Sequence, residues 1–150
     1  MIAATIPGQP TTPEKFSADV SQITIRWNEP VSGNGGSIIT DYRVYWDAGT
    51  GSGVFVYLGN TQSYETFTVN ANVSPSFSGG KTFTFQVSAV NVIGEGVVSG
   101  SYSVIAAAVP TAPSTPTLVE QSPTLIKIAW EAQSDGGSPI HFYTVLWDQS

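Results

Sequence analysis

A short segment that ends in tryptophan occurs twice in this chain, and it constrains the fold more than any other feature. Residues 23–27 have the sequence ITIRW, and residues 126–130, 103 positions later, have the sequence IKIAW. In both copies isoleucines alternate with other residues and lead to the tryptophan, which is the pattern of a half-buried β-strand. A spacing of about 100 residues is the size of one β-sandwich domain, so the sequence predicts that such a domain is repeated.

The residues around and between the two copies alternate in the same way and contain no helical period. They predict six further strands, at residues 16–20, 39–47, 54–58, 64–69, 82–91 and 97–107, separated by turns rich in glycine and asparagine. Short, regularly spaced strands are typical of an antiparallel sandwich, so the predicted fold is all-β with seven strands. The side chains that share the inward face form the predicted core: Ile23, Ile25, Trp27, Tyr42, Val44, Phe83, Phe85 and Val87.

The repeat extends beyond the tryptophan segments. Three prolines at positions 7, 10 and 13 recur at 110, 113 and 116, and residues 2–7 match residues 105–110 at the same spacing. We therefore expect residues 1–6 to be a linker or the tail of a preceding repeat, 7–108 to be one complete domain, and 109–150 to be the first three strands of a second domain. Because three strands cannot bury both faces of their sheets, we expect six side chains there to lack a core: Ile126, Ile128, Trp130, Tyr143, Val145 and Trp147.

The composition excludes several classes of partner. The net charge is −6, the isoelectric point is near 4.4 and the five basic residues are scattered, so nucleic acid and anionic membranes are not expected partners. No apolar run reaches the roughly 18 residues that a membrane helix needs, and the first residues lack the pattern of a signal peptide. The absence of cysteine excludes disulfides and thiolate metal sites.

These segments resemble the fibronectin type III family. The resemblance rests on the prolines at the start of the domain, Trp27, the pair Tyr42 and Val44, and the run FTFQVSAVN at residues 83–91 followed by a glycine turn. It covers residues 7–108 fully and 110–150 in half, and it implies an immunoglobulin-like sandwich in a tandem array. The family usually has tyrosine where Phe83 stands, and the tyrosine hydroxyl ties a corner of the sandwich to nearby backbone. We expect packing against Phe77 to take the place of that bond.

No group of residues indicates catalysis or a cofactor. His141 is the single histidine, and no nucleophile motif lies near it. Asp135 precedes two glycines, which favours a turn over a calcium site that needs six or more oxygens. Asp47 and Asp148 end matching segments of the two copies, which favours a structural or solubilising role. We therefore expect a protein that is not an enzyme and has no metal or cofactor site.

Candidate contact residues lie on the predicted loops and on one outward strand face. Trp27 and Trp46 point into the core, whereas Tyr45 points to the opposite face. Loops on a rigid sandwich are the usual place for contacts, which adds residues of the loops at 32–37 and 92–96. The candidate partner contacts are Tyr45, Asn34, Ile93 and Glu95. Asn72 begins an Asn-Val-Ser sequon in a long loop and is a candidate N-glycosylation site, used only if the protein is secreted.

The fold by itself implies no single function. The resemblance implies a non-catalytic structural or adhesion module, a link in an elongated array within a larger cell-surface or extracellular protein. Its expected partners are other protein domains, including neighbouring repeats of the same parent chain. Two alternatives stay open: a protein-binding module of an intracellular filament or cytoskeletal assembly, and an accessory domain of a large carbohydrate-active enzyme.

Overall fold

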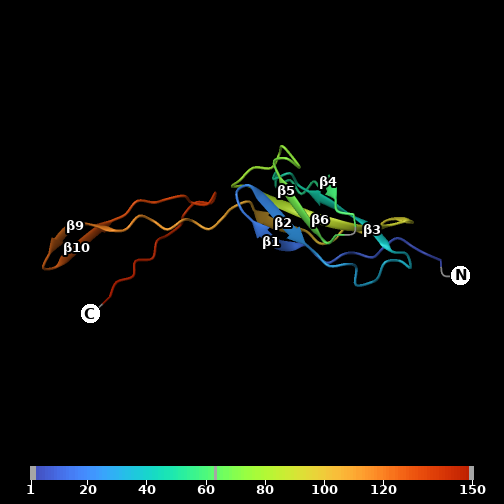
Figure 1. Ribbon diagram of the computed structural model, residues 1–150, viewed down its shortest axis with the longest axis horizontal. Helices are drawn as coiled ribbons and strands as arrows, with labels where there is room; N and C mark the ends of the chain where they lie inside the picture. The colour runs from blue at the N-terminus through green and yellow to red at the C-terminus, as the bar shows by residue number, and fades with distance from the viewer. Residues whose placement is uncertain (1–2, 63, 149–150) are drawn as a thin grey trace.

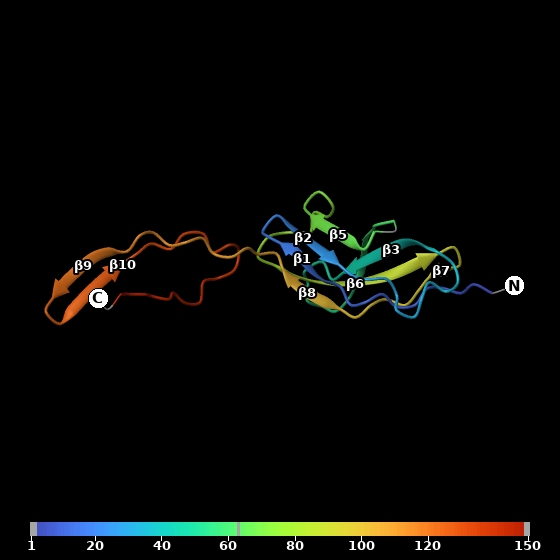
Figure 2. The ribbon, with the colours of Figure 1, turned by 60° about the horizontal axis from the view of Figure 1, so that its bottom comes forward.

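Two parts follow one another along the chain in the computed structural model, which describes residues 3–62 and 64–148. Strands β1 to β8 form a sandwich of two sheets, and β9 and β10 form a hairpin that extends away from it (Figure 1). Figure 2 shows the amino-terminal segment and this hairpin at opposite ends of the long axis. No described residue lies in a helix, and so the described part of the chain holds no helix able to cross a bilayer.

Both sheets of the sandwich are antiparallel, which confirms the predicted all-β fold. One sheet has the order β1-β2-β5; the other has the order β4-β3-β6, with β7 and β8 both paired to β6. The strands are β1 (Glu14–Ala18), β2 (Gln22–Arg26), β3 (Ile39–Trp46), β4 (Val56–Asn60), β5 (Thr66–Asn70), β6 (Thr82–Asn91), β7 (Gly94–Glu95) and β8 (Tyr102–Ile105).

The first strand lies two residues earlier than its predicted range of 16–20. The cause is Asp19, whose carboxylate accepts hydrogen bonds from the backbone N–H groups of Ser21 at 2.7 Å and Gln22 at 2.9 Å. This side chain replaces strand pairing with a turn, so β1 ends before it and β2 begins directly after it.

The last predicted strand, 97–107, is divided. A two-residue strand, β7, precedes it, and β8 occupies only its second half. Between them Ser99 remains tied to β6: its N–H donates to the carbonyl oxygen of Val87 at 2.7 Å, and its hydroxyl accepts from the Val87 N–H at 2.9 Å. A side-chain hydroxyl thus takes the place of one ladder bond where the strand is irregular. Strand β4 begins at Val56 and so lies two residues later than predicted.

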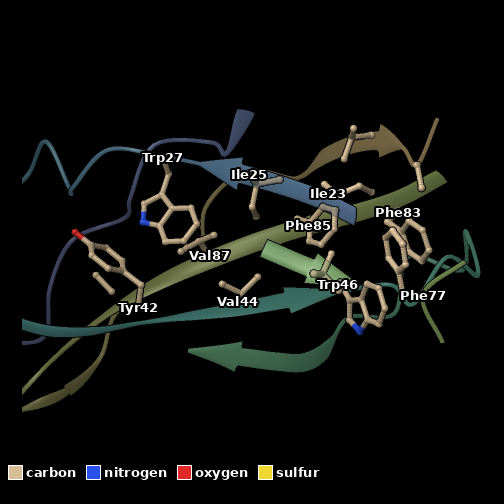
Figure 3. Packing of buried hydrophobic residues seen from close by; sticks show 14 residues of the cluster. Ile23, Ile25, Trp27, Tyr42, Val44, Trp46, Phe77, Phe83, Phe85 and Val87 are labelled. Carbon is tan, nitrogen blue, oxygen red and sulfur yellow. The ribbon is translucent and has the colours of Figure 1, made fainter. Parts of the chain in front are cut away.

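The core lies between the two sheets (Figure 3). All eight predicted core side chains are buried, none more than 3% exposed, and Trp46 is buried with them. The period-two pattern therefore identified the inward face of strands β2, β3 and β6 correctly.

One end of the core is a stack of three aromatic rings. Phe83 lies between Trp46 and Phe77, with ring centroids 5.1 Å away on each side and interplanar angles of 12° and 11° (Figure 3). The expected contact of Phe83 with Phe77 is confirmed. Stacking on both faces of the ring supplies packing at a position where the family usually has a tyrosine hydroxyl bond.

The second hairpin reproduces the first in its register. Strands β9 (Thr117–Ser122) and β10 (Leu125–Ala129) pair as β1 and β2 do, 103 residues later. Even the irregularity recurs, since the pairing shifts between Lys15 and Ser17 and again between Leu118 and Glu120. The sequence repeat is therefore also a repeat of local structure.

The predicted third strand of the second repeat does not form. Residues 139–148 run back along the hairpin without strand pairing (Figure 1). In the sandwich β3 is held between β4 and β6, and no described segment of the second repeat supplies such neighbours. Five of the six side chains expected to lack a core are exposed, which confirms the prediction for them, whereas Trp130 is half-buried.

Candidate partner-binding sites

Two of the four predicted contact residues meet on the outer face of the larger sheet. Tyr45 comes from β3 and Glu95 from β7, and the tyrosine hydroxyl donates to Oε1 of the carboxylate at 2.6 Å. Ser88 of β6 donates to the same oxygen at 2.5 Å, and Arg43 donates to Oε2 at 2.6 Å. We call these four residues the Glu95 cluster; it crosses three neighbouring strands.

The electrostatics of the cluster follow from its partial burial. Desolvation alone would raise the pKa of the Glu95 carboxyl, but the hydrogen bonds from Ser88 and Tyr45 and the charge of Arg43 outweigh it, so the pKa is lowered. Burial, and then the bond to Glu95, raise the pKa of the Tyr45 hydroxyl. Near neutral pH the carboxylate is therefore charged and accepts three bonds, which fixes the rotamers around it.

Tyr57 of β4 extends this face and was not among the predicted contacts. Its ring meets that of Tyr45 edge-on, with the centroids 5.9 Å apart, and 56% of Tyr57 is exposed. The surrounding face is hydroxyl-rich, with a hydrogen bond between Thr84 and Ser103 at 2.9 Å. Tyrosine and arginine are enriched at the centre of protein interfaces. The sequence pointed to Tyr57 only by its position after an apolar run in a predicted strand. Its contact with Tyr45 depends on the register between β3 and β4, which the sequence alone does not show.

The other two predicted contacts, Asn34 and Ile93, meet at the amino-terminal end of the sandwich, and Asn91 joins them. Asn91 Nδ2 donates to the carbonyl oxygens of Thr5 at 2.7 Å and Asn34 at 2.9 Å. Its Oδ1 accepts from the N–H groups of Ile93 at 2.9 Å and Gly94 at 3.2 Å. A single side chain, only 4% exposed, therefore holds three segments together.

This arrangement separates the roles of the two predicted residues. Asn34 has a structural part, because its Oδ1 accepts from the Gly36 N–H at 3.0 Å and so closes its own turn, while its contact with a partner stays a prediction. Ile93 is 53% exposed and available for contact. In the sequence Asn91 is only the last residue of the run at 83–91. Nothing in that run indicates its hydrogen bond to Thr5, 86 residues away.

The segment that leads into the first strand of each repeat is hydrogen-bonded to a loop of the same repeat, and the pattern occurs twice. In the first repeat residues 5–11 donate to residues 28–35, and in the second residues 108–114 donate to residues 131–136. The three bonds of the first repeat are Thr5 N to Gly35 O at 2.8 Å, Gly8 N to Gly33 O at 3.1 Å and Thr11 N to Asn28 O at 3.2 Å. The three matching bonds of the second repeat are Ala108 N to Gly136 O at 2.8 Å, Thr111 N to Ser134 O at 3.0 Å and Ser114 N to Glu131 O at 3.0 Å.

The remaining candidates have structural surroundings. Asp135 accepts from the Gly137 N–H at 2.9 Å, as Asn34 does from Gly36, so the turn interpretation is confirmed. The Asp47 carboxylate accepts from three backbone N–H groups at 3.0 to 3.2 Å and organises a turn. Asn72 is exposed in the turn after β5, and its glycosylation stays a prediction. Within residues 3–62 and 64–148 no three acidic or histidine side chains gather as a metal site would require.

Comparison with known proteins gives relatives for most of the chain. Fibronectin type-III domain-containing protein 3A of Homo sapiens is 30% identical over a 159-residue alignment that covers 94% of this chain and 12% of that protein. The protein of the same name from Pongo abelii is 29% identical, with 94% and 13% covered. The chain thus spans about an eighth of the length of these curated relatives.

Solved structures agree on the fold. The crystal structure of domains A168–A170 from titin matches with a TM-score of 0.60 and 25% identity, covering 69% of this chain and 33% of that one. The sixth fibronectin type III domain of human fibronectin type III domain containing protein 3 matches with a TM-score of 0.54 and 19% identity, covering 73% and 96%. The family model described as "Fibronectin type III domain" matches residues 9–105. The chain therefore belongs to the fibronectin type III domain family.

Proposed function

We propose that this chain is a non-catalytic structural and adhesion link in an array of fibronectin type III domains of a larger cell-surface or extracellular protein. The observation that carries the proposal is the junction: the same three backbone hydrogen bonds tie the incoming segment to the loop in both repeats. Backbone bonds that recur with the sequence period are expected of links built for serial connection.

The geometry of the sandwich suits this role. Its incoming and outgoing segments lie at opposite ends of the long axis (Figure 2), so each link adds to the length of the array. A strand rises about 3.3 Å per residue, so strands of this length with their loops give roughly 30–40 Å per link. The loop bonds at each junction then act on the direction in which the next link extends.

The Glu95 cluster with Tyr57 is the proposed contact face for other protein domains. It lies on the outer face of the larger sheet, and its Glu95 end adjoins the incoming segment, because β-carbons on Gly94 and Gly96 would meet Ile6 and Pro7. Its charged groups are already paired, which lowers the cost of removing water from them on binding. The exposed Tyr57 ring supplies an amphipathic anchor for such a contact.

The titin likeness, at 25% identity, supports the alternative setting of an intracellular filament or cytoskeletal assembly for the same kind of link. The accessory domain of a carbohydrate-active enzyme has no comparable observation in its favour. A signal peptide in the parent sequence would separate the two settings of the link.

Small-angle scattering tests the link directly. The chain is compared with a longer version in which residues 1–104 are placed before Ile2 of the complete chain, so that the 103-residue period continues. The proposal expects the maximum dimension to grow by about one sandwich length, roughly 30–40 Å. A longer version that is no more extended than the original would refute the role of a link.

A further inference from the structure

The loop of the second repeat does more than hold its own incoming segment, because it also lies against the end of the sandwich. A β-carbon on Gly137 would come within 2.8 Å of Val20 Cγ1, and one on Gly80 within 3.1 Å of the Gly137 carbonyl oxygen. Gly80 in turn donates to the Ala106 carbonyl oxygen at 2.9 Å. We call Val20, Gly80 and Ala106 the carboxyl-terminal pole.

Close backbone approach explains why this loop is built from glycine. Gly136 is buried, and a β-carbon on it would overlap the carbonyl oxygen of Ala108. Both Gly136 and Gly137 have positive φ, at 69° and 86°, a region that other residues rarely adopt. The contact is therefore between backbones and a single valine side chain, and any added side chain on the loop would hold the two surfaces apart.

The first repeat presents the same loop at its amino-terminal end. Gly35 and Gly36 have φ of 73° and 77°, and the turn is closed by the Asn34 side chain as its counterpart is closed by Asp135. Asn91 fixes this loop from behind through its bond to the Asn34 carbonyl oxygen. The loop at residues 34–36 is therefore held in the same conformation as the matching loop 101 residues later, which lies against the carboxyl-terminal pole.

We propose that the loop at residues 34–36 is a docking surface for a preceding domain of the same fold. Its partner is the carboxyl-terminal pole of that preceding domain. Such a pole has a β-branched residue in the turn between the first two strands, as Val20 is here, and a glycine before the sixth strand, as Gly80 is here. This inference rests on the proposed function and deepens it, because it makes each junction of the array a contact rather than a flexible tether. Preorganisation by Asn91 lowers the ordering cost of that contact.

The extended version of the chain, with residues 1–104 before Ile2, brings the pole of one sandwich to the loop of the next. Residual dipolar couplings measured on both sandwiches report whether they share one orientation. We expect a single alignment tensor to fit both. Gly36→Ala in the second sandwich, and separately Val20→Ala in the first, should make the two tensors differ in magnitude. Gly51→Ala is the matched control, since Gly51 also has positive φ, 65°, but nothing lies within 4 Å of its β-carbon position.

Two sandwiches that need different tensors in the unsubstituted protein would overturn the docking surface while leaving the extended link intact, because scattering would still show the added length. Equal effects of Gly36→Ala and Gly51→Ala, with no effect of Val20→Ala, would also overturn it. If Gly36→Ala prevents folding, Val20→Ala still decides, since Val20 is exposed and its truncation spares the core.

Discussion

Removal of the Asn91 side chain is the sharpest test of how the amino-terminal end is held. Asn91→Ala deletes four hydrogen bonds, two donated to the carbonyl oxygens of Thr5 and Asn34 and two accepted from Ile93 and Gly94. A typical bond contributes about 0.5–1.5 kcal/mol net. Water reaches Thr5 and Ile93 after the change, because both residues are exposed, so we expect a loss of about 2–4 kcal/mol rather than the full sum.

Asn91→Asp separates the donors from the acceptors. It keeps an oxygen for the N–H groups of Ile93 and Gly94 but directs a second oxygen toward the two carbonyls that Nδ2 now contacts at 2.7 and 2.9 Å. A buried carboxylate facing carbonyl oxygens has a raised pKa, so the protein should be more stable below that pKa and lose stability as the pH rises through it. Asn91→Ala should show no such added pH dependence.

Chemical denaturation monitored by tryptophan fluorescence measures both losses, and hydrogen exchange of the Gly94 amide reports the local bond. Asn72→Ala, at an exposed asparagine in a turn, is the control and should change stability by under about 0.5 kcal/mol. A loss of that small size for Asn91→Ala, with unchanged exchange at Gly94, would show that the three segments are held together by something other than Asn91.

Three further predictions concern the core, the Glu95 cluster and the second repeat. Trp27→Ala should cost about 3–5 kcal/mol in denaturation, because the ring is buried, and a cost under about 1 kcal/mol would contradict its place in the core. The pKa of Glu95 is lowered in the folded state, so the charged carboxylate stabilises the folded protein above the ordinary pKa of 4.5, and this contribution is lost as the pH falls below it. The Glu95→Gln variant should therefore lose less stability on acidification than the parent protein, and an equal loss would refute this. Residues 1–150 should bind a hydrophobic dye more than residues 1–108, and a second cooperative unfolding step would instead show that the second repeat folds alone.

Local pattern was enough to predict the core and the approximate positions of most strands of the sandwich. The alternation around Trp27 and Phe85 has a period of two residues, so it identifies the buried face without knowledge of which strands pair. The Phe83 contact with Phe77 was accessible because the family resemblance marks that corner of the sandwich. Prediction failed at strand ends, where one side chain such as Asp19 decides the turn.

The candidate sites depend on contacts between residues that are far apart in the sequence, so only some of their residues could be predicted. Tyr45 and Glu95 were chosen separately, one for its outward position and the other for its loop, and their hydrogen bond follows from the pairing of β3 and β7 to the same strand. Asn91 was missed because its partners are backbone atoms, which carry no sequence signal. The third strand of the second repeat was predicted from a match to residues 42–47, but a strand also needs neighbours to pair with.

The recurrence of the junction bonds has a geometric consequence for any longer array. The same three bonds hold the incoming segment of each repeat to a loop of that repeat. If that loop also docks on every preceding sandwich in the same way, consecutive links are related by the same rotation and the same translation. Repetition of one such operation generates a screw, so successive Glu95 clusters would wind around a common axis at a fixed pitch. The spacing between contact faces along one side of the array would then be set by the twist at Gly35 and Gly136, not by the length of a single sandwich.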